Sequence, residues 1–210
     1  MPVIGITGGI ATGKSTFTRA LLRRVPAEFF DADQAARSLL ESDAGIRFAV
    51  EKTFGADIYS DEGKPDRQRL RDLIFSDEQS RKRLEEILHP AIHARWISLG
   101  EHARRTRSWL FVDIPLLFET GAETHCDRVV VVACSPRTQR QRLAHERGLP
   151  APIAEAVIAA QLNLETKTTR ADHLIWNDST VSCLERQADL LASWLTTFYG
   201  RNSHSTVADR

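Results

Sequence analysis

The sequence lacks a long apolar run and an excess of one charge. No window approaches the roughly 20 consecutive apolar residues that a membrane span requires, and no basic stretch precedes an apolar run at the N-terminus, so we expect a soluble protein without anchor or leader. The 28 basic and 28 acidic residues cancel, which leaves no overall field to attract nucleic acid or an anionic membrane. A site for a polyanion must therefore be local.

The chain has three cysteines and four tryptophans. The three cysteines, Cys126, Cys134 and Cys183, are odd in number, far apart and unlike any metal-ligand spacing, which excludes a disulfide framework and a zinc site. We expect them to be buried, reduced thiols of a cytoplasmic protein. Because each tryptophan lies in an apolar periodic stretch, core positions are also expected for Trp96, Trp109, Trp176 and Trp194.

What the sequence does contain is an alternation of short apolar runs with helical periodicity. The apolar runs predict buried strands at residues 2–7, 28–31, 109–112, 129–133 and 173–176. Continuous apolar runs are typical of strands that are covered on both faces. Strands that alternate with helices indicate a parallel sheet with right-handed crossovers. The predicted fold class is therefore α/β, a doubly wound parallel sheet.

The length and pattern predict one domain over residues 1–199 with a helical insertion. The insertion is expected at about residues 42–107, where charge and helical periodicity are dense, with a turn at 61–65 and a break at His89-Pro90. Residues 200–210 are polar and lack periodicity. They are expected to form a disordered tail.

Residues 8–15 read GGIATGKS and match the phosphate-loop pattern G-x-x-x-x-G-K-[ST], between a predicted strand and a predicted helix. Glycines let the backbone curl with its N–H groups inward, and the helix adds the positive end of its dipole. In such a loop Lys14 neutralises charge at the β and γ phosphates, and Thr16 reaches the α-phosphate region. The sequence therefore predicts a site for ATP.

Two oxygen donors are candidates for holding Mg²⁺. The Ser15 hydroxyl closes the loop motif, and Mg²⁺ keeps several waters and needs few protein ligands. Asp113 follows the apolar strand at 109–112, where P-loop proteins often place the acid that orients the metal. The alternative is that Asp113 is a capping acid at the end of a strand.

A phosphate loop alone allows a kinase, a GTPase switch or a motor. Asp31 and Asp33 fall where a strand ends and a helix begins, which is where parallel sheets place ligands. One carboxylate there can accept a proton from an attacking hydroxyl, or the two acids form a helix N-cap pair. The guanine-reading motif N-K-x-D of GTPases does not match Asn177, which is followed by Asp178 and Ser179.

Six segments together resemble the dephospho-coenzyme A kinase family. They are GITGGIATGKST, DADQAAR, LHP, DIPLLFE, the AAQ that ends at Gln161, and ADHLIWND, which occur in the family's order over almost the whole chain. The resemblance implies transfer of the γ-phosphoryl group of ATP to the ribose 3′-hydroxyl of dephospho-coenzyme A, the last step of coenzyme A biosynthesis. The runner-up is a nucleoside monophosphate or shikimate kinase, against which LHP and PLLFE argue.

The resemblance also implies roles for individual residues. Asp33 is expected to be the general base, while Asp31 shapes the turn. ATP is expected to contact Gly9, Ala11, Thr12, Gly13, Lys14, Ser15, Thr16 and Asn177. The acceptor site is expected to include Thr7, Asp33, Arg37, His89, Pro115, Leu116, Leu117 and Phe118. Lys167 and Arg170 match the K-x-x-R-A-D segment of the family.

The resemblance implies a lid at about residues 137–165, and here the sequence departs from the family. The lid pattern R-x-x-x-R-D-G has glutamate, Glu146, at its second arginine. A lid arginine stabilises the charge of the transferring phosphoryl group, so Arg142 or a displaced Arg147 is expected to act, with Arg140 as a third candidate. The sequence leaves the oligomeric state and nucleotide selectivity open.

Overall fold

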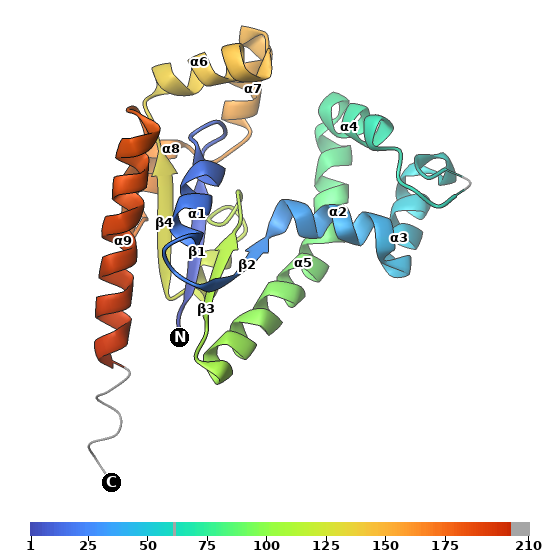
Figure 1. Cartoon of the computed structure of the whole chain (residues 1–210). Helices are drawn as coiled ribbons and strands as arrows, with labels where there is room; N and C mark the ends of the chain where they lie inside the picture. The colour runs from blue at the N-terminus through green and yellow to red at the C-terminus, as the bar shows by residue number, and fades with distance from the viewer. Residues whose placement is uncertain (61, 203–210) are drawn as a thin grey trace. The chain divides into compact units, whose positions relative to one another are not determined.

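The computed structural model describes residues 1–60 and 62–202, without the side chains of 74–76 and 201–202. The chain forms two compact units (Figure 1). The first combines Met1–Phe30 with the chain from Leu99 onward, and the second is Asp31–Ser98. In the part of the chain that is described, no helix is both long enough and apolar enough to cross a membrane.

The first unit is built on a five-stranded sheet in the order β2-β3-β1-β4-β5. The strands are β1 (Val3–Gly8), β2 (Ala27–Asp31), β3 (Trp109–Asp113), β4 (Arg128–Ala133) and β5 (His173–Trp176). β1 pairs in parallel with β3 and with β4, and β4 pairs in parallel with β5. All residues of the central strands β1 and β3 are buried, as expected of strands covered on both faces. The predicted α/β class is confirmed.

Helices cover this sheet and connect its strands. They are α1 (Lys14–Leu22), the end of α5 (Glu78–Thr106), α6 (Pro136–Arg147), α7 (Ala151–Ala159), α8 (Leu164–Thr169) and α9 (Val181–Asn202), with a short 3₁₀ turn, η2, at Ala122–His125. Side chains of α1 and α9 pack with those of β1, β3, β4 and β5 in one core cluster that includes Phe17, Leu21 and Leu195. Because α1 begins directly after β1 and the loop, this core fixes the loop at both of its ends.

The second unit is helical. It contains α2 (Ala32–Ser42), α3 (Ala44–Phe54), a 3₁₀ turn η1 (Ala56–Ile58), α4 (Arg67–Ser76) and most of α5. Its core consists of Leu39, Val50, Ile58, Tyr59, Leu70, Leu84 and Leu88. Aspartates accept hydrogen bonds from backbone N–H groups at the starts of all four α-helices, namely Asp31, Asp43, Asp66 and Asp77, and such caps are each worth about 1 kcal/mol.

The expected break at His89-Pro90 is wrong, because α5 continues through Pro90. A proline inside a helix costs about 3 kcal/mol or more, partly because it removes the hydrogen bond to the carbonyl four residues earlier. That carbonyl belongs to Glu86, an exposed residue, so water can satisfy it. Leu84 and Leu88, on the turns before Pro90, are buried in the helical core, and their burial offsets the cost.

The bounds of the helical unit, Asp31–Ser98, differ from the expected 42–107. α2 belongs to this unit because Leu39 packs in its core. The last turns of α5 belong to the sheet unit, where Ala103 is fully buried and a methyl group on Gly100 would lie 3.3 Å from Val3. At the C-terminus, α9 extends to Asn202 rather than ending before the expected tail, and residues 203–210 lie outside the described chain.

Tryptophan and cysteine are only partly where the sequence analysis expects them. Trp96 and Trp109 are buried, but Trp176 and Trp194 are 47% and 37% exposed. They lie on β5, which ends the sheet, and on α9. Core positions for this second pair are therefore wrong. All three cysteines are free, with Cys134 buried, Cys126 half-buried and Cys183 exposed, so burial is also wrong for Cys183.

The three thiols should differ in reactivity. Burial raises the pKa of Cys126 to about 12 and that of Cys134 to about 11, whereas hydrogen bonds from the Ser179 and Thr180 hydroxyl groups lower the pKa of Cys183. Since the thiolate is the reactive form, iodoacetamide near neutral pH should label Cys183 first, and all three in guanidinium. Mass spectrometry of the peptides measures this, and equally fast labelling of Cys134 in the native protein would contradict it.

Candidate functional site

The phosphate loop connects β1 to α1, and three of its glycines are required by close backbone or side-chain approaches. A Cβ atom on Gly8 would lie 2.3 Å from the carbonyl oxygen of Val132, and one on Gly9 would lie 2.9 Å from Nε2 of Gln139. Gly13 has φ 89°, and its Cβ would lie 2.1 Å from Nδ2 of Asn177. No larger residue fits these positions without movement of the surroundings.

The carbonyl groups of residues 9–12 are all bound by side-chain donors. In chain order they accept hydrogen bonds from Thr12 Oγ1 at 2.9 Å, Gln139 Nε2 at 2.8 Å, Arg142 Nη1 at 3.3 Å and Asn177 Nδ2 at 2.8 Å. Within this stretch Ala11 adopts φ 57°, a left-handed conformation that costs a non-glycine residue about 1 kcal/mol or more. The side-chain donors therefore stabilise a turn that the loop alone would not keep.

Whereas the loop carbonyls are bound, the N–H groups at the start of α1 are available to a ligand. The first N–H groups of a helix have no partner inside the helix, and together with the helix dipole they form a site for an anion. The helix begins at Lys14, and Gly13 stands at its N-cap position without a capping side chain. The loop is thus built to bind phosphate oxygens.

Lys14 and Asp113 bring the two charges of the site together. The Lys14 ammonium group forms an ion pair with the Asp113 carboxylate at the end of β3, where Asp113 lies beside Ile6 of β1. Asp113 is 5% exposed. The pair keeps both charged groups at the carboxyl end of the central strands, which is where open parallel sheets bind ligands.

Ser15 and Asp113 fit a bound Mg²⁺. Both offer hard oxygen ligands, and the Ser15 residue is exposed beside Lys14. Among the described residues, no group of three or more histidine, cysteine, aspartate or glutamate side chains is placed to hold a metal. Mg²⁺ is characteristically bound through one or two protein groups together with substrate phosphates and water, so a donor set of this size suits it.

The segment after β3 is held by a buried polar network. The carbonyl oxygen of Pro115 accepts hydrogen bonds from Thr7 Oγ1 and from Lys167 Nζ, both at 3.0 Å. Lys167 is fully buried and forms an ion pair with Glu119 at 2.8 Å. Four residues expected in the acceptor site lie in this segment, starting at the anchored Pro115. Pro115 and Leu116 are half-buried, while Leu117 and Phe118 are buried.

Comparison with known proteins identifies the family. The family model described as dephospho-CoA kinase matches residues 2–182. Curated dephospho-CoA kinases from Anaeromyxobacter dehalogenans and Methylococcus capsulatus are 40% and 38% identical, over 96% and 91% of this chain and 95% of each relative. The chain belongs to the dephospho-CoA kinase family.

Solved structures agree with the fold. The Thermus thermophilus protein TT1252 superposes with a TM-score of 0.73 at 32% identity, covering 93% of this chain and 98% of that one. A dephospho-CoA kinase from Campylobacter jejuni has a TM-score of 0.66 at 24% identity, covering 92% and 97%, which supports the fold alone. The predicted membership in the family is confirmed by the family model and the curated relatives.

Two arginines of the expected lid segment lie in different surroundings. Arg142, on α6, donates to the Ala11 carbonyl and, at 2.9 Å, to the Asn177 carbonyl, so it holds the loop against the end of β5. Arg147 lies in the last turn of α6 and is exposed. Between them in the chain, Glu146 is also exposed. Arg140, the third candidate, is paired with Glu155 of α7.

Asn177 binds the loop, and its neighbour Asp178 binds the residue that begins α6. Asn177 binds the Thr12 carbonyl through its side chain and the Ala133 carbonyl, at 2.8 Å, through its N–H. Asp178 accepts a hydrogen bond from the Ser135 N–H at the start of α6. Burial raises the pKa of Asp178, but hydrogen bonds from Ser135, Thr138 and Trp176 outweigh this and leave it below the ordinary value.

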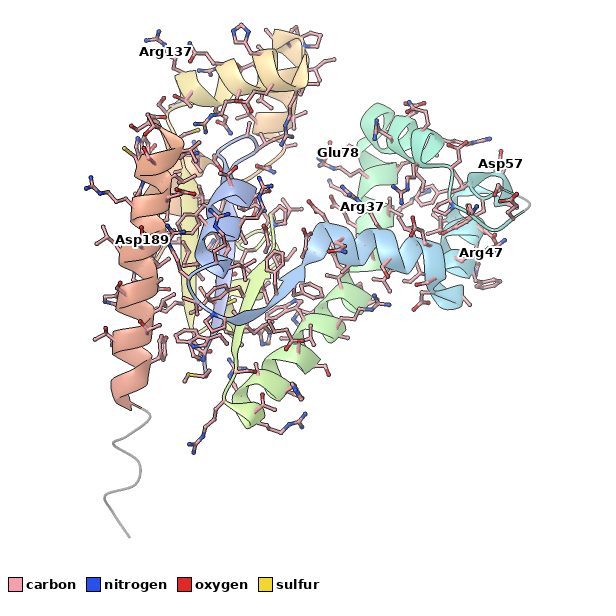
Figure 2. All side chains as sticks on the ribbon, in the orientation of Figure 1. Arg37, Arg47, Asp57, Glu78, Arg137 and Asp189 are labelled. Carbon is pink, nitrogen blue, oxygen red and sulfur yellow. The ribbon has the colours of Figure 1, made fainter. Side chains whose placement is uncertain are left out.

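Three expected site residues lie on the helical unit. Asp33 and Arg37 are exposed and four residues apart on α2, and therefore share one face of that helix; Figure 2 labels Arg37. His89 is half-buried on α5. Asp31 accepts a hydrogen bond from the N–H of Gln34 at 2.9 Å, so it caps α2, in agreement with the turn-shaping role expected for it.

Gln139 is the loop-binding residue that sequence reasoning missed. It is 5% exposed, although the α6 sequence around it, RTQRQR, is wholly polar and is typical of a solvent-facing helix. A buried glutamine of this kind is recognised only when its distant partner, the carbonyl of Ile10, is known. Gln161, at the end of the AAQ segment, also contacts the loop, since its Oε1 accepts from the Ile10 N–H at 3.0 Å.

Proposed function

We propose that this protein transfers the γ-phosphoryl group of ATP to the ribose 3′-hydroxyl of dephospho-coenzyme A, giving coenzyme A and ADP. The observation that carries the proposal is the phosphate loop, with four bound carbonyls and the Lys14–Asp113 pair, in a chain of the dephospho-CoA kinase family. The three free cysteines support a reducing, cytoplasmic setting.

The loop residues act on the triphosphate. ATP would contact Gly9, Ala11, Thr12, Gly13, Lys14, Ser15, Thr16 and Asn177, with the N–H groups at the start of α1 directed at phosphate oxygens. Lys14 neutralises the charge that develops on the transferring phosphoryl group. Ser15 and Asp113 would hold Mg²⁺, which would offset the negative charge of the triphosphate when bound.

The acceptor hydroxyl needs a base, and Asp33 has the chemistry for it. A ribose hydroxyl attacks phosphorus effectively only when its proton has somewhere to go, and the Asp33 carboxylate is exposed on α2. Arg37, one turn later on the same face, offers a cation for the acceptor's diphosphate. The remaining acceptor contacts would come from Thr7, His89 and the half-buried Pro115 and Leu116, with Leu117 and Phe118 supporting them from the core.

Removal of the Lys14 charge tests the assignment of the loop. With Mg·ATP and dephospho-coenzyme A, and with adenosine monophosphate and shikimate as competing acceptors, we expect coenzyme A as the product, identified by mass. Lys14→Ala should lower kcat/KM by roughly 10³-fold or more, whereas Lys64→Ala, an exposed lysine paired with Glu62, should act as wild type. Phosphorylation of another acceptor alone, or near-normal activity of Lys14→Ala, would contradict the proposal.

Asp33→Asn separates proton transfer from binding. We expect kcat to fall by roughly 10²- to 10⁴-fold, the usual contribution of a general base, while KM for both substrates stays within about threefold. Asp31→Asn is the matched control, because asparagine caps a helix as well as aspartate does and the residue is two positions away. A parallel loss of acceptor binding in Asp33→Asn would make Asp33 a positioning group instead.

The two lid arginines should give different kinetic signatures. Arg142 binds two carbonyls at the loop, so Arg142→Ala should mainly raise KM for ATP. Arg147, exposed at the end of α6, is proposed as the arginine that reaches the transferring phosphoryl group, so Arg147→Ala should mainly lower kcat, by about 10³-fold.

Steady-state kinetics distinguish these two arginine effects. The control is Arg137→Ala, an exposed residue at the start of α6 that Figure 2 labels. A silent Arg147→Ala together with an inactive Arg142→Ala would overturn the assignment of Arg147.

A further inference from the structure

Ile10, in the middle of the phosphate loop, is held on both of its backbone groups by glutamine side chains. Its N–H donates to Oε1 of Gln161 at 3.0 Å, and its carbonyl accepts from Nε2 of Gln139 at 2.8 Å. No other residue of the loop has both backbone groups bound by side chains among the hydrogen bonds of the described chain. The peptide groups on either side of Ile10 therefore have fixed orientations.

The two glutamines lie near the two ends of one segment of the chain, residues 136–161. Gln139 lies in the first turn of α6, where its own N–H donates to the Ser135 carbonyl at 3.0 Å. Gln161 follows α7, and its N–H donates to the Ile158 carbonyl at 3.2 Å. Residues 136–161 thus leave the loop at Ile10 and return to it at the same residue. This segment makes up most of the expected lid.

Neighbouring contacts hold both ends of this segment in place. The residue after Gln161, Leu162, donates its N–H to Glu119 at 2.9 Å, and Glu119 also pairs with the buried Lys167. On the departing side, Ser135 and Asp178 cap the start of α6. A shift of either end of the segment would therefore have to break a hydrogen bond to Ile10, and a change at Ile10 would be felt at both ends.

We propose that Gln139 and Gln161 are positioning residues that couple the phosphate loop to residues 136–161. Through Ile10 they hold the loop in the conformation that presents its N–H groups to the triphosphate, so nucleotide binding and the placement of this segment stabilise each other. The inference rests on the proposed binding of ATP at the loop. It assigns no contact between either glutamine and the nucleotide.

Kinetics test the positioning role. Methionine matches glutamine in length and shape but cannot form these hydrogen bonds, so Gln139→Met and Gln161→Met should each raise KM for ATP roughly threefold to tenfold, as the loss of one hydrogen bond implies. KM for dephospho-coenzyme A should change by less than about twofold, since neither glutamine belongs to the acceptor site. The matched control is Gln141→Met, an exposed glutamine on the same helix.

A double variant shows whether the glutamines act through the same peptide. If both act through Ile10, the increase in KM for ATP in Gln139→Met/Gln161→Met should be smaller than the product of the single increases. Multiplicative effects would indicate two independent structural contacts and overturn the proposal. If Gln139→Met does not fold, the single variant Gln161→Met, at a half-buried residue, still tests the proposal, and an unchanged KM for ATP in that variant would overturn it.

Hydrogen exchange tests the coupling itself. In the wild type, Mg·ADP should slow exchange both in the loop, residues 8–16, and in residues 136–161. In the double variant at saturating Mg·ADP, the loop should still be protected, while protection of residues 136–161 should fall clearly below that of the wild type, because Arg142 then remains as the link from this segment to the loop. Protection of residues 136–161 that is as strong in the double variant as in the wild type would overturn the coupling alone. A wild-type loop that Mg·ADP does not protect would instead contradict nucleotide binding, and with it the proposed function.

Discussion

The site depends on the outward hydrogen bonding of the loop carbonyls. A hydrogen bond to a peptide oxygen also fixes the direction of the N–H on the other side of the same peptide group, so the donors bound to the carbonyls of residues 9–12 decide which N–H groups the loop can offer. The N–H of Ile10 is not among these, because Gln161 binds it. The donors to the carbonyls come from the loop, from α6 and from the residue after β5. The anion site is consequently a product of the sheet and its crossovers, and the glycine pattern alone would not create it.

The charged groups at this edge of the sheet are paired. Lys14 is paired with Asp113, and the fully buried Lys167 is paired with Glu119 while it also binds the Pro115 carbonyl. A buried charge is tolerated when it is paired and hydrogen-bonded. The balanced net charge of the chain agrees with this, because attraction for a triphosphate is concentrated in a few groups at one edge of the sheet.

Much of the fold could be predicted from the sequence, because its signals are local. The apolar runs at β1, β3 and β4 and the glycine loop before Lys14 are each readable within a few residues. Signals that depend on distant partners were not readable. Gln139 looks like a surface residue until the Ile10 carbonyl is placed beside it, and Pro90 looks like a helix break until the burial of Leu84 and Leu88 is known. The prediction that Trp176 is buried was wrong for a similar reason, because the position of β5 at the end of the sheet is not visible in the local sequence.

The most direct test of the account follows the phosphoryl group itself. With ATP labelled by ¹⁸O on the non-bridging oxygens of its γ-phosphate, mass fragmentation of the product should place the label in a phosphate on the ribose 3′-oxygen and leave the diphosphate of the acceptor unlabelled. That result is expected if the loop presents the γ-phosphoryl group to the 3′-hydroxyl of dephospho-coenzyme A. Label in inorganic phosphate only, or at any other position of the product, would contradict it.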